Sequence, residues 1–275
     1  MAGFFGLFDY SKPGKGVEKG APQKKSFFVF FEILFRKFWK LIQANLLFIL
    51  FSIPIVTIGL ANGGLTVITR NYVREDHAFL WGDFIEGIKK NWKQLLVSSI
   101  LQLIVPLLLI FNVSLSLENA AGSKIWYVFA VINSSMLVVA IFMSYYIPYM
   151  IVTFKLTLKQ IFKNAAIFAF ANFLNNVLIT LIIALFWIVL VAAAILLMPI
   201  GTVVATLIVI FFGFAFTNFA TNFIIYPKIK KLMIDPYYEA HPEEEKPFHL
   251  TRLEESEDEE EVVFEDMGRM TDFDD

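Results

Sequence analysis

The sequence predicts an all-α, polytopic transmembrane helical bundle. Hydrophobic residues make up 57% of its 275 positions and charged residues only 17%, which is typical of multi-pass membrane proteins. Between Lys163 and Lys228 there is not one Asp, Glu, Lys, Arg or His. Because a helix needs about 20 apolar residues to cross about 30 Å of hydrocarbon, this stretch alone can hold two spans.

The charges divide the chain into a basic body and an acidic tail. Residues 1–234 carry 20 Lys and Arg against 8 Asp and Glu, whereas residues 235–275 carry 3 against 17. The chain has no cysteine, so it forms no disulfide. We predict four parts: 1–25, a flexible basic arm that lacks the pattern of a cleaved signal peptide; 26–40, an interfacial amphipathic helix; 41–231, a transmembrane helical domain; 232–275, an acidic disordered tail.

Ser26–Lys40 alternates aromatic and charged residues, and Glu32 and Arg36 stand at i, i+4 on one helix face. This pattern fits an interfacial helix, and it fits equally an uninterrupted extension of the first span. Both interpretations stay open.

Leu41–Val73 is long for one span and short for two, and it is interrupted at Pro54 and Gly59. Proline removes a helical hydrogen bond, so we predict a break near 54–59. Beyond it, clear spans are Leu95–Ser114, Trp126–Ile151, Phe173–Leu197 and Thr202–Tyr226.

The positive-inside rule decides the count of spans. If Leu41–Val73 is a short hairpin, every Lys and Arg except Lys124 falls on one side of the membrane. We therefore predict six membrane segments, with the first two short or partly re-entrant and both termini cytoplasmic. Five spans are the alternative. Asp235-Pro236 is predicted to end the last helix.

Two basic elbows resemble each other. Phe84–Trp92 and Leu158–Ala165 each place a Lys directly before an Asn, Asn91 and Asn164, and each leads into an apolar span. This similarity has two interpretations. It indicates either a duplicated unit of elbow plus hairpin, which is a common origin of transporters, or two amphipathic elbows that are alike because both lie at the membrane interface.

No Asp, Glu, His, Lys or Arg lies deep in a predicted span, which argues against a proton-coupled carrier. The polar groups left inside the predicted spans are amides and hydroxyls. They form either a polar seam that lines a path for a neutral solute, or hydrogen bonds between helices. We favour the hydrogen bonds between helices. Gly59-x-x-x-Gly63 is a small-residue packing motif. The seam comprises Asn133, Asn172, Asn176, Asn218 and Asn222.

Enzyme motifs are missing from the sequence. There is no phosphate-binding glycine loop, no His-Glu-x-x-His and no Gly-x-Ser-x-Gly. The three histidines fall in predicted loop or tail, too sparse for a convincing metal site. We predict no enzymatic activity, no cofactor, no metal and no nucleic-acid partner.

The stretch Asn45-Leu-Leu through Pro54-Ile-Val-Thr57-Ile-Gly59, followed by a basic helix and then Phe84 and Lys-Asn, resembles the YesL family of bacterial membrane proteins, over roughly residues 26–230. This chain departs from the family at Leu60-Ala61-Asn62 and in its long acidic tail. The resemblance implies a family of unknown function from Gram-positive bacteria, often encoded beside carbohydrate ABC transporters and sensor kinases. The family signature, which includes a possible partner elbow, is Asn45, Thr57, Arg70, Arg74, Phe84, Lys89, Lys90 and Asn91.

We therefore expect a multi-pass protein of the bacterial plasma membrane that is an accessory or interaction partner of a carbohydrate ABC uptake system. Its partners would be the bilayer and permease, ATPase or sensor kinase subunits. The alternative is a transporter or channel for a small neutral solute. A wet cavity along the seam would favour transport, and amides bonded to one another in a dry core would favour the accessory role.

Overall fold

The computed structural model describes residues 26–242, and over that range it consists of helices without strands. The predicted arm 1–25 and most of the predicted acidic tail lie outside the described residues. In chain order the elements are α1 (Ser26–Arg36), α2 (Phe38–Ser52), the 3₁₀ turn η1 (Ile55–Thr57), α3 (Ile58–Val73), α4 (Leu80–Asn119), α5 (Ile125–Thr153), α6 (Leu158–Ala171), α7 (Phe173–Leu196), α8 (Ile200–Ile208), the π-helix η2 (Val209–Gly213), α9 (Phe214–Ile229), the π-helix η3 (Lys230–Ile234) and α10 (Asp235–Ala240).

Within residues 26–242, four helices are long and apolar enough to cross a membrane, and each contains one of the four clear predicted spans or nearly all of it. Helices α2 and α3 have 15 and 16 residues, about 22–24 Å at 1.5 Å per residue, which is less than the roughly 30 Å hydrocarbon core. The chain is thus a helical protein with the features of a membrane protein. The four long helices are Leu80–Asn119, Ile125–Thr153, Phe173–Leu196 and the continuous run Ile200–Ala240.

The helix breaks after Ser52, where the sequence predicts a break at Pro54. Pro54 is extended, with φ −75° and ψ 114°, and precedes the single turn η1. The Thr57 hydroxyl lies 2.6 Å from both the Phe51 and the Pro54 carbonyl oxygens. This side chain therefore satisfies carbonyl groups that the interrupted helix leaves without an intrahelical partner.

Ser26–Lys40 is interrupted at Lys37, so it is not an unbroken extension of the first span; its place at a membrane interface stays a prediction. Helices α1 and α2 are separated at Lys37 alone, whose φ of −103° and ψ of 8° are not helical. Hydrogen bonds still bridge the junction, from Lys37 N to Ile33 O and from Leu41 N to Lys37 O, both 2.9 Å. The segment is therefore a helix with a local kink.

Helix α3 is the centre of the packing, and small residues let α4 approach it. A Cβ on Gly59 would overlap the Ser99 side chain, and one on Gly63 would overlap Leu95. From the other side, a Cβ on Gly87 would lie 2.6 Å from Val67 Cγ2. Such contacts are shorter than van der Waals separation, so these positions accept only glycine without rearrangement.

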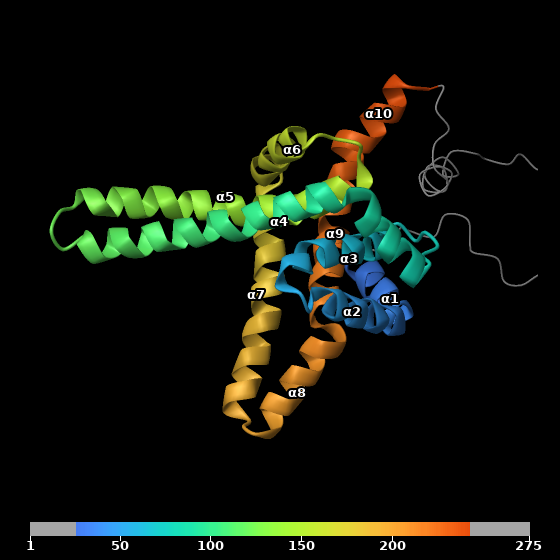
Figure 1. Ribbon diagram of the computed structural model, residues 1–275, viewed down its shortest axis with the longest axis horizontal. Helices are drawn as coiled ribbons and strands as arrows, with labels where there is room; N and C mark the ends of the chain where they lie inside the picture. Colours follow the sequence, from blue (N-terminus) through green and yellow to red (C-terminus); the bar gives the residue numbers. More distant parts are fainter. Residues whose placement is uncertain (1–25, 243–275) are drawn as a thin grey trace, which may run out of the picture.

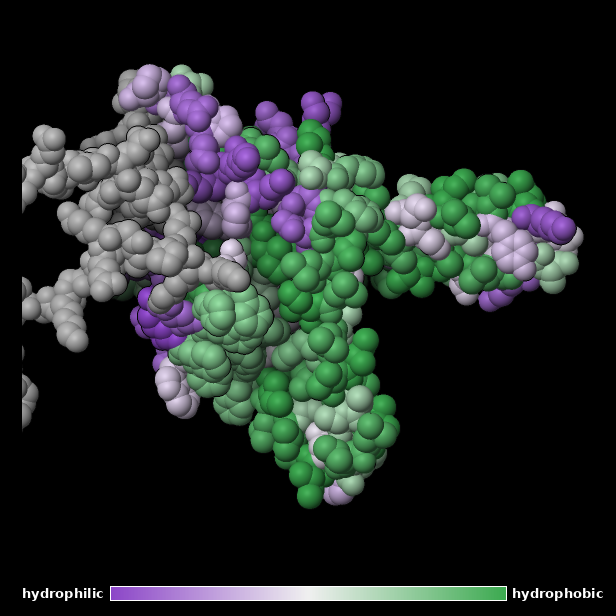
Figure 2. Space-filling view, turned by 180° about the vertical axis from the view of Figure 1, so that it is seen from behind, coloured by the Kyte–Doolittle hydropathy of each residue, from purple (hydrophilic) through white to green (hydrophobic). Residues whose placement is uncertain are grey.

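Two long hairpins project from this core in different directions (Figure 1). The first hairpin is α4 with α5, and the second hairpin is α7 with α8, η2 and α9. In this arrangement the two hairpins cannot both lie along one membrane normal. Figure 2 shows the second hairpin almost entirely hydrophobic on the face in view. Hydrophilic residues gather at the end of the core where α6 and α10 lie, which we call the basic end, and at the tip of the first hairpin.

The last helix does not end at Asp235-Pro236, which corrects the prediction from sequence. The backbone changes to π-type hydrogen bonding in η3, and Asp235 N donates to Lys230 O. Helix α10 then begins with proline in its first turn, where the missing N–H has no intrahelical partner to lose. The helix therefore continues to Ala240, past the predicted boundary at residue 232.

Candidate functional site

Arg70 fastens the end of α5 to α3. Its Nη1 donates to Val152 O at 2.8 Å and lies 3.3 Å from Thr153 Oγ1. Its Nε and Nη2 donate to Asn71 Oδ1 at 3.2 and 3.0 Å, and Asn71 Nδ2 in turn donates to Asp83 Oδ2 at 3.3 Å. A cation at the carbonyl end of a helix satisfies its orphan acceptors and its dipole. Arg70 therefore has a structural task that accounts for its place in the signature.

Arg74 lies between two tyrosines. Its Nη2 donates to the Tyr149 hydroxyl at 2.9 Å, and its guanidinium carbon lies 5.7 Å from the Tyr149 ring centre and 5.4 Å from that of Tyr226. Planar guanidinium groups stack well on aromatic faces. Arg74 Nε and the hydroxyls of Tyr72 and Tyr226 are buried with no hydrogen-bond partner among the described residues.

A left-handed residue ends α3 and ties it to the α1–α2 kink. Glu75 has φ 59°, and Asp76 N donates to Asn71 O at 2.8 Å while Glu75 N donates to Tyr72 O at 3.2 Å, the pattern of a Schellman cap. Glycine usually fills this position because it has no Cβ. In this chain the position is held by Glu75, and its carboxylate forms an ion pair with Arg36.

Lys37 lies beside this cap, 5.5 Å from the Tyr72 ring centre. Burial lowers the pKa of Lys37, and the positive charges of Lys40 and Arg36 lower it further. The basic end of the core is thus crowded with cations around the C-terminus of α3.

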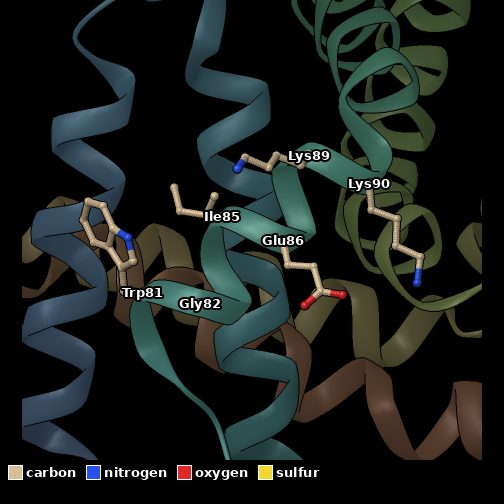
Figure 3. Close-up of a pocket in the computed structure, with 6 residues that line it drawn as sticks. All are labelled: Trp81, Gly82, Ile85, Glu86, Lys89 and Lys90. Atoms are coloured by element: carbon tan, nitrogen blue, oxygen red, sulfur yellow. The ribbon is translucent and has the colours of Figure 1, made fainter.

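The first predicted elbow is the N-terminal part of α4. Phe84 is fully buried against Gly64 and contacts the Phe51 ring at 5.4 Å, so it anchors the elbow to the core. Asn91 bonds only to Gly87 O of its own helix, at 3.2 Å. Lys89 and Lys90 are exposed, and Figure 3 shows them pointing to different sides of α4, with Glu86 on the side of Lys90.

The second elbow differs from the first in how it joins its span. It forms the separate helix α6, capped at its start by Thr157 and Gln160, and it ends at Asn172 before α7 begins. Helix α4, by contrast, runs without interruption from elbow into span.

Asn218 and Asn222 join a polar cluster between α3 and α9. Asn218 Nδ2 donates to Asn62 Oδ1 at 3.0 Å and to Thr66 Oγ1 at 3.1 Å, and its Oδ1 lies 2.5 Å from Thr69 Oγ1. Asn222 Nδ2 donates to Thr69 Oγ1 at 2.7 Å and to Asn218 Oδ1 at 2.9 Å. We call these five residues the Asn–Thr cluster.

Asn172 and Asn176 form a separate Tyr–Asn cluster with Tyr146 of α5. The Tyr146 hydroxyl donates to Asn176 Oδ1 at 2.6 Å and accepts from Asn172 Nδ2 at 2.8 Å. Asn176 Nδ2 also donates to the Phe168 and Ala169 carbonyls at 3.2 and 3.1 Å. These carbonyls belong to the end of α6, where they lack intrahelical partners. Asn176 therefore supplies hydrogen bonds to them at the break between α6 and α7.

Asn133 joins neither cluster. It lies on the outer part of α5 and donates to Phe129 O of its own helix at 2.8 Å. The predicted seam is therefore two clusters and one isolated residue rather than one continuous line.

Asn45 holds the π-helix η2, a role that the sequence does not indicate. Its Nδ2 donates to Val209 O at 3.1 Å and Ile210 O at 2.6 Å, and its Oδ1 accepts from Ala215 N at 2.8 Å. A π-bulge disturbs the regular ladder of backbone bonds, and this buried amide bonds three of the groups involved. The available signal is a single Asn in the apolar face of α2.

Two hollows border these residues. A cavity of about 230 Å³ is lined by four residues of the Asn–Thr cluster, Asn62, Thr66, Asn218 and Asn222, and among others by Ser144, Tyr145 and Thr217. An open groove of about 660 Å³ lies between Lys89–Gln94 of α4 and the segment Ile151–Thr157. Within residues 26–242, no group of three or more His, Asp or Glu residues could hold a metal ion.

Comparison with known proteins gives one match. The family described as "Protein of unknown function, DUF624" matches residues 41–113, which run from α2 through α3 into the apolar part of α4. Neither the curated proteins nor the solved structures contain a match. The matched stretch holds every residue of the family signature, from Asn45 to Asn91, and is compatible with the resemblance to the YesL family.

Proposed function

We propose that this chain is a non-enzymatic, multi-pass protein of a Gram-positive plasma membrane that acts as an accessory partner of a carbohydrate ABC uptake system. The observation that carries the proposal is the bonding of the asparagines. Asn172, Asn176, Asn218 and Asn222 bond within two separate clusters, and Asn133 lies apart. Most of their hydrogen-bonding groups are therefore used between helices, although Asn218 and Asn222 also line the cavity of about 230 Å³. The carbohydrate context comes from the family resemblance.

The basic end supplies the partner surface in this proposal. Lys89, Lys90 and Lys93 on α4 face outward beside Lys155. Exposed charges of one sign speed and orient the association of proteins. A cytoplasmic subunit with an acidic surface, such as an ATPase or sensor kinase domain, would meet this face.

The proposed topology has six membrane segments and cytoplasmic termini, which puts the basic end in the cytoplasm. Because the two hairpins point in different directions (Figure 1), this topology requires them to realign when the protein enters a bilayer. A single cysteine in residues 1–25 tests it, since the chain has no native cysteine: six segments place that cysteine in the cytoplasm, and five spans place it outside the cell.

Affinity purification of the full chain from gently solubilised membranes, followed by mass spectrometry, tests the function. We expect an ABC permease pair, its ATPase or a sensor kinase to co-purify. The double variant Lys89→Glu and Lys90→Glu should reduce recovery at least fivefold, whereas Lys228→Glu with Lys230→Glu, a matched pair on another helix, should not. A protein that purifies alone would contradict the accessory role.

A transporter for a small neutral solute is the second candidate, and the cavity of about 230 Å³ beside the Asn–Thr cluster favours it. Solute flux into proteoliposomes that an Asn218→Leu variant abolishes would support this candidate over the first. Flux equal to that of empty liposomes would dismiss it.

A further inference from the structure

The groove between α4 and the α5–α6 connection is built on a fixed frame. Gln94 Nε2 donates to Leu156 O at 2.9 Å on one side, and Arg70 Nη1 donates to Val152 O at 2.8 Å on the other. Thr157 then caps α6. The connecting segment is therefore held at both ends, so the groove is a lasting feature of the surface.

The lining of this groove is positively charged. Lys89, Lys90, Lys93 and Lys155 line it and are exposed, and no acidic residue is among its lining residues. Trp92 lies between the lysines with 48% of its surface exposed. Glu86 is not among the residues that line the groove; it lines the adjoining hollow drawn in Figure 3, together with Lys89 and Lys90. The groove therefore fits an acidic extended peptide that carries an apolar residue.

The chain itself contains such a peptide beyond the described residues. Residues 254–261 hold seven acidic residues in eight positions, and Val262-Val-Phe264 follows. Eleven residues lie between Pro242 and Glu254, and the twelve Cα–Cα steps between them span about 40 Å when the chain is extended. Helix α10, which leads to this segment, leaves the core at the same end as α6 (Figure 1).

We propose that the acidic run 254–261 binds in this groove of its own chain. Opposite charges draw the run to the four lysines, and Phe264 and its neighbours meet Trp92. The interaction is electrostatic and solvent-exposed, so salt weakens it. If the proposed function holds, the bound tail regulates partner binding. The tail then covers the lysine surface assigned to the partner, and an acidic partner has to displace the tail before it can bind.

A cysteine pair tests the proposal in the purified full-length protein, without any partner, so its failure is separate from failure of the proposed function. Asn91→Cys, at a lining residue that leaves Trp92 and the lysines intact, would be combined with Ser256→Cys and oxidised in phosphatidylcholine nanodiscs at 50 mM NaCl. We expect a disulfide at least tenfold faster than in the control pair Val128→Cys with Ser256→Cys, and a rate near the control at 500 mM NaCl.

Charge variants complete the test. Lys89→Glu, Lys90→Glu and Lys93→Glu together should slow the disulfide to the control rate, and so should Glu257→Gln, Asp258→Asn, Glu259→Gln and Glu260→Gln, which alter no residue of the described helices. Lys228→Glu, Lys230→Glu and Lys231→Glu, a matched basic trio, should leave the rate within twofold. Equal rates for the test and control pairs, or indifference to both sets of charge changes, would overturn the proposal.

Anionic lipid headgroups share the chemistry of the acidic run. If they rather than the tail fill the groove, nanodiscs with phosphatidylglycerol will show lysine-dependent enrichment of that lipid while phosphatidylcholine nanodiscs show no fast disulfide. That pair of results would also overturn the proposal.

Discussion

The two hairpins both have apolar faces, yet different chemistry attaches them to the core. The α4 arm of the first hairpin is attached by close approach, because Gly59, Gly63 and Gly87 remove the side chains that would separate α3 from α4; Arg70 holds the end of its α5 arm. The second is attached by buried amides, in the Asn–Thr cluster, in the Tyr–Asn cluster and at Asn45. The difference shows two ways to bind helices when lipid removes much of the hydrophobic driving force between them.

The tips of the hairpins differ as well. Glu118 and Lys124 flank the turn of the first hairpin, and charged side chains favour water over lipid. The turn of the second hairpin is Leu197, Met198, Pro199 and Ile200. Leu197, Met198 and Ile200 are each more than 60% exposed. An uncharged, exposed apolar turn is stable only against lipid or another apolar surface.

The largest contrast is expected in labelling of the two tips. Gly122→Cys in the first tip should react with a membrane-impermeant maleimide at least ten times faster than Met198→Cys in the second, because a thiol in apolar surroundings forms little thiolate. The measurement compares labelling in intact cells with labelling after solubilisation. Equal rates in intact cells would mean that both tips reach water, and the contrast between them would disappear.

Gly59→Val is expected to have the largest effect on stability. Its Cβ would overlap the Ser99 side chain and lie 3.2 Å from Leu95 O, so the helices have to separate. Overpacking of this kind costs about 3 kcal/mol at the upper end of its usual range. Thermal denaturation followed by size-exclusion chromatography in detergent measures the loss.

Gly82→Val is the matched control, because the nearest atom to a Cβ there is Phe79 Cβ at 3.8 Å. It should melt within 2 °C of the native protein. If both variants melted alike, the first hairpin would not depend on close approach.

Asn222→Ala should destabilise the second hairpin by about 2 kcal/mol. It removes two hydrogen bonds and leaves a small void where the amide packed against Thr69 and Asn218. Asn133→Ala makes the same change at an Asn that bonds only to its own helix, and it should have almost no effect. Equal losses for the two variants would remove the distinction between clustered and isolated amides.

The sequence predicts the parts of the fold that depend on local signals. The clear spans and the break at Pro54 follow from apolar length and from proline's missing N–H. The continuation past Pro236 is not predicted, because it depends on π-type bonding in η3 that no local pattern indicates.

The candidate site is predicted in composition but not in arrangement. Asn218 and Asn222 are found together because they lie at i, i+4 on one helix. Their partners Asn62 and Thr69 come from a helix about 150 residues away, and such pairings depend on tertiary packing. Tyr146 is missed for the same reason: nothing near it in the sequence indicates that its hydroxyl meets Asn172 and Asn176.

The smallest effect is expected for Tyr146→Phe. The ring stays packed on Phe168, whose ring centre lies 5.2 Å away, and only the hydroxyl is removed. Asn176 keeps two carbonyl partners, so the loss should be about 1 kcal/mol, near the net value of hydrogen bonds between membrane helices. Tyr127→Phe, at an exposed ring on the same helix, is the control. A melting temperature equal to that of the control would show that the carbonyl bonds of Asn176 alone hold the α6–α7 break, and that the second hairpin's base does not need α5.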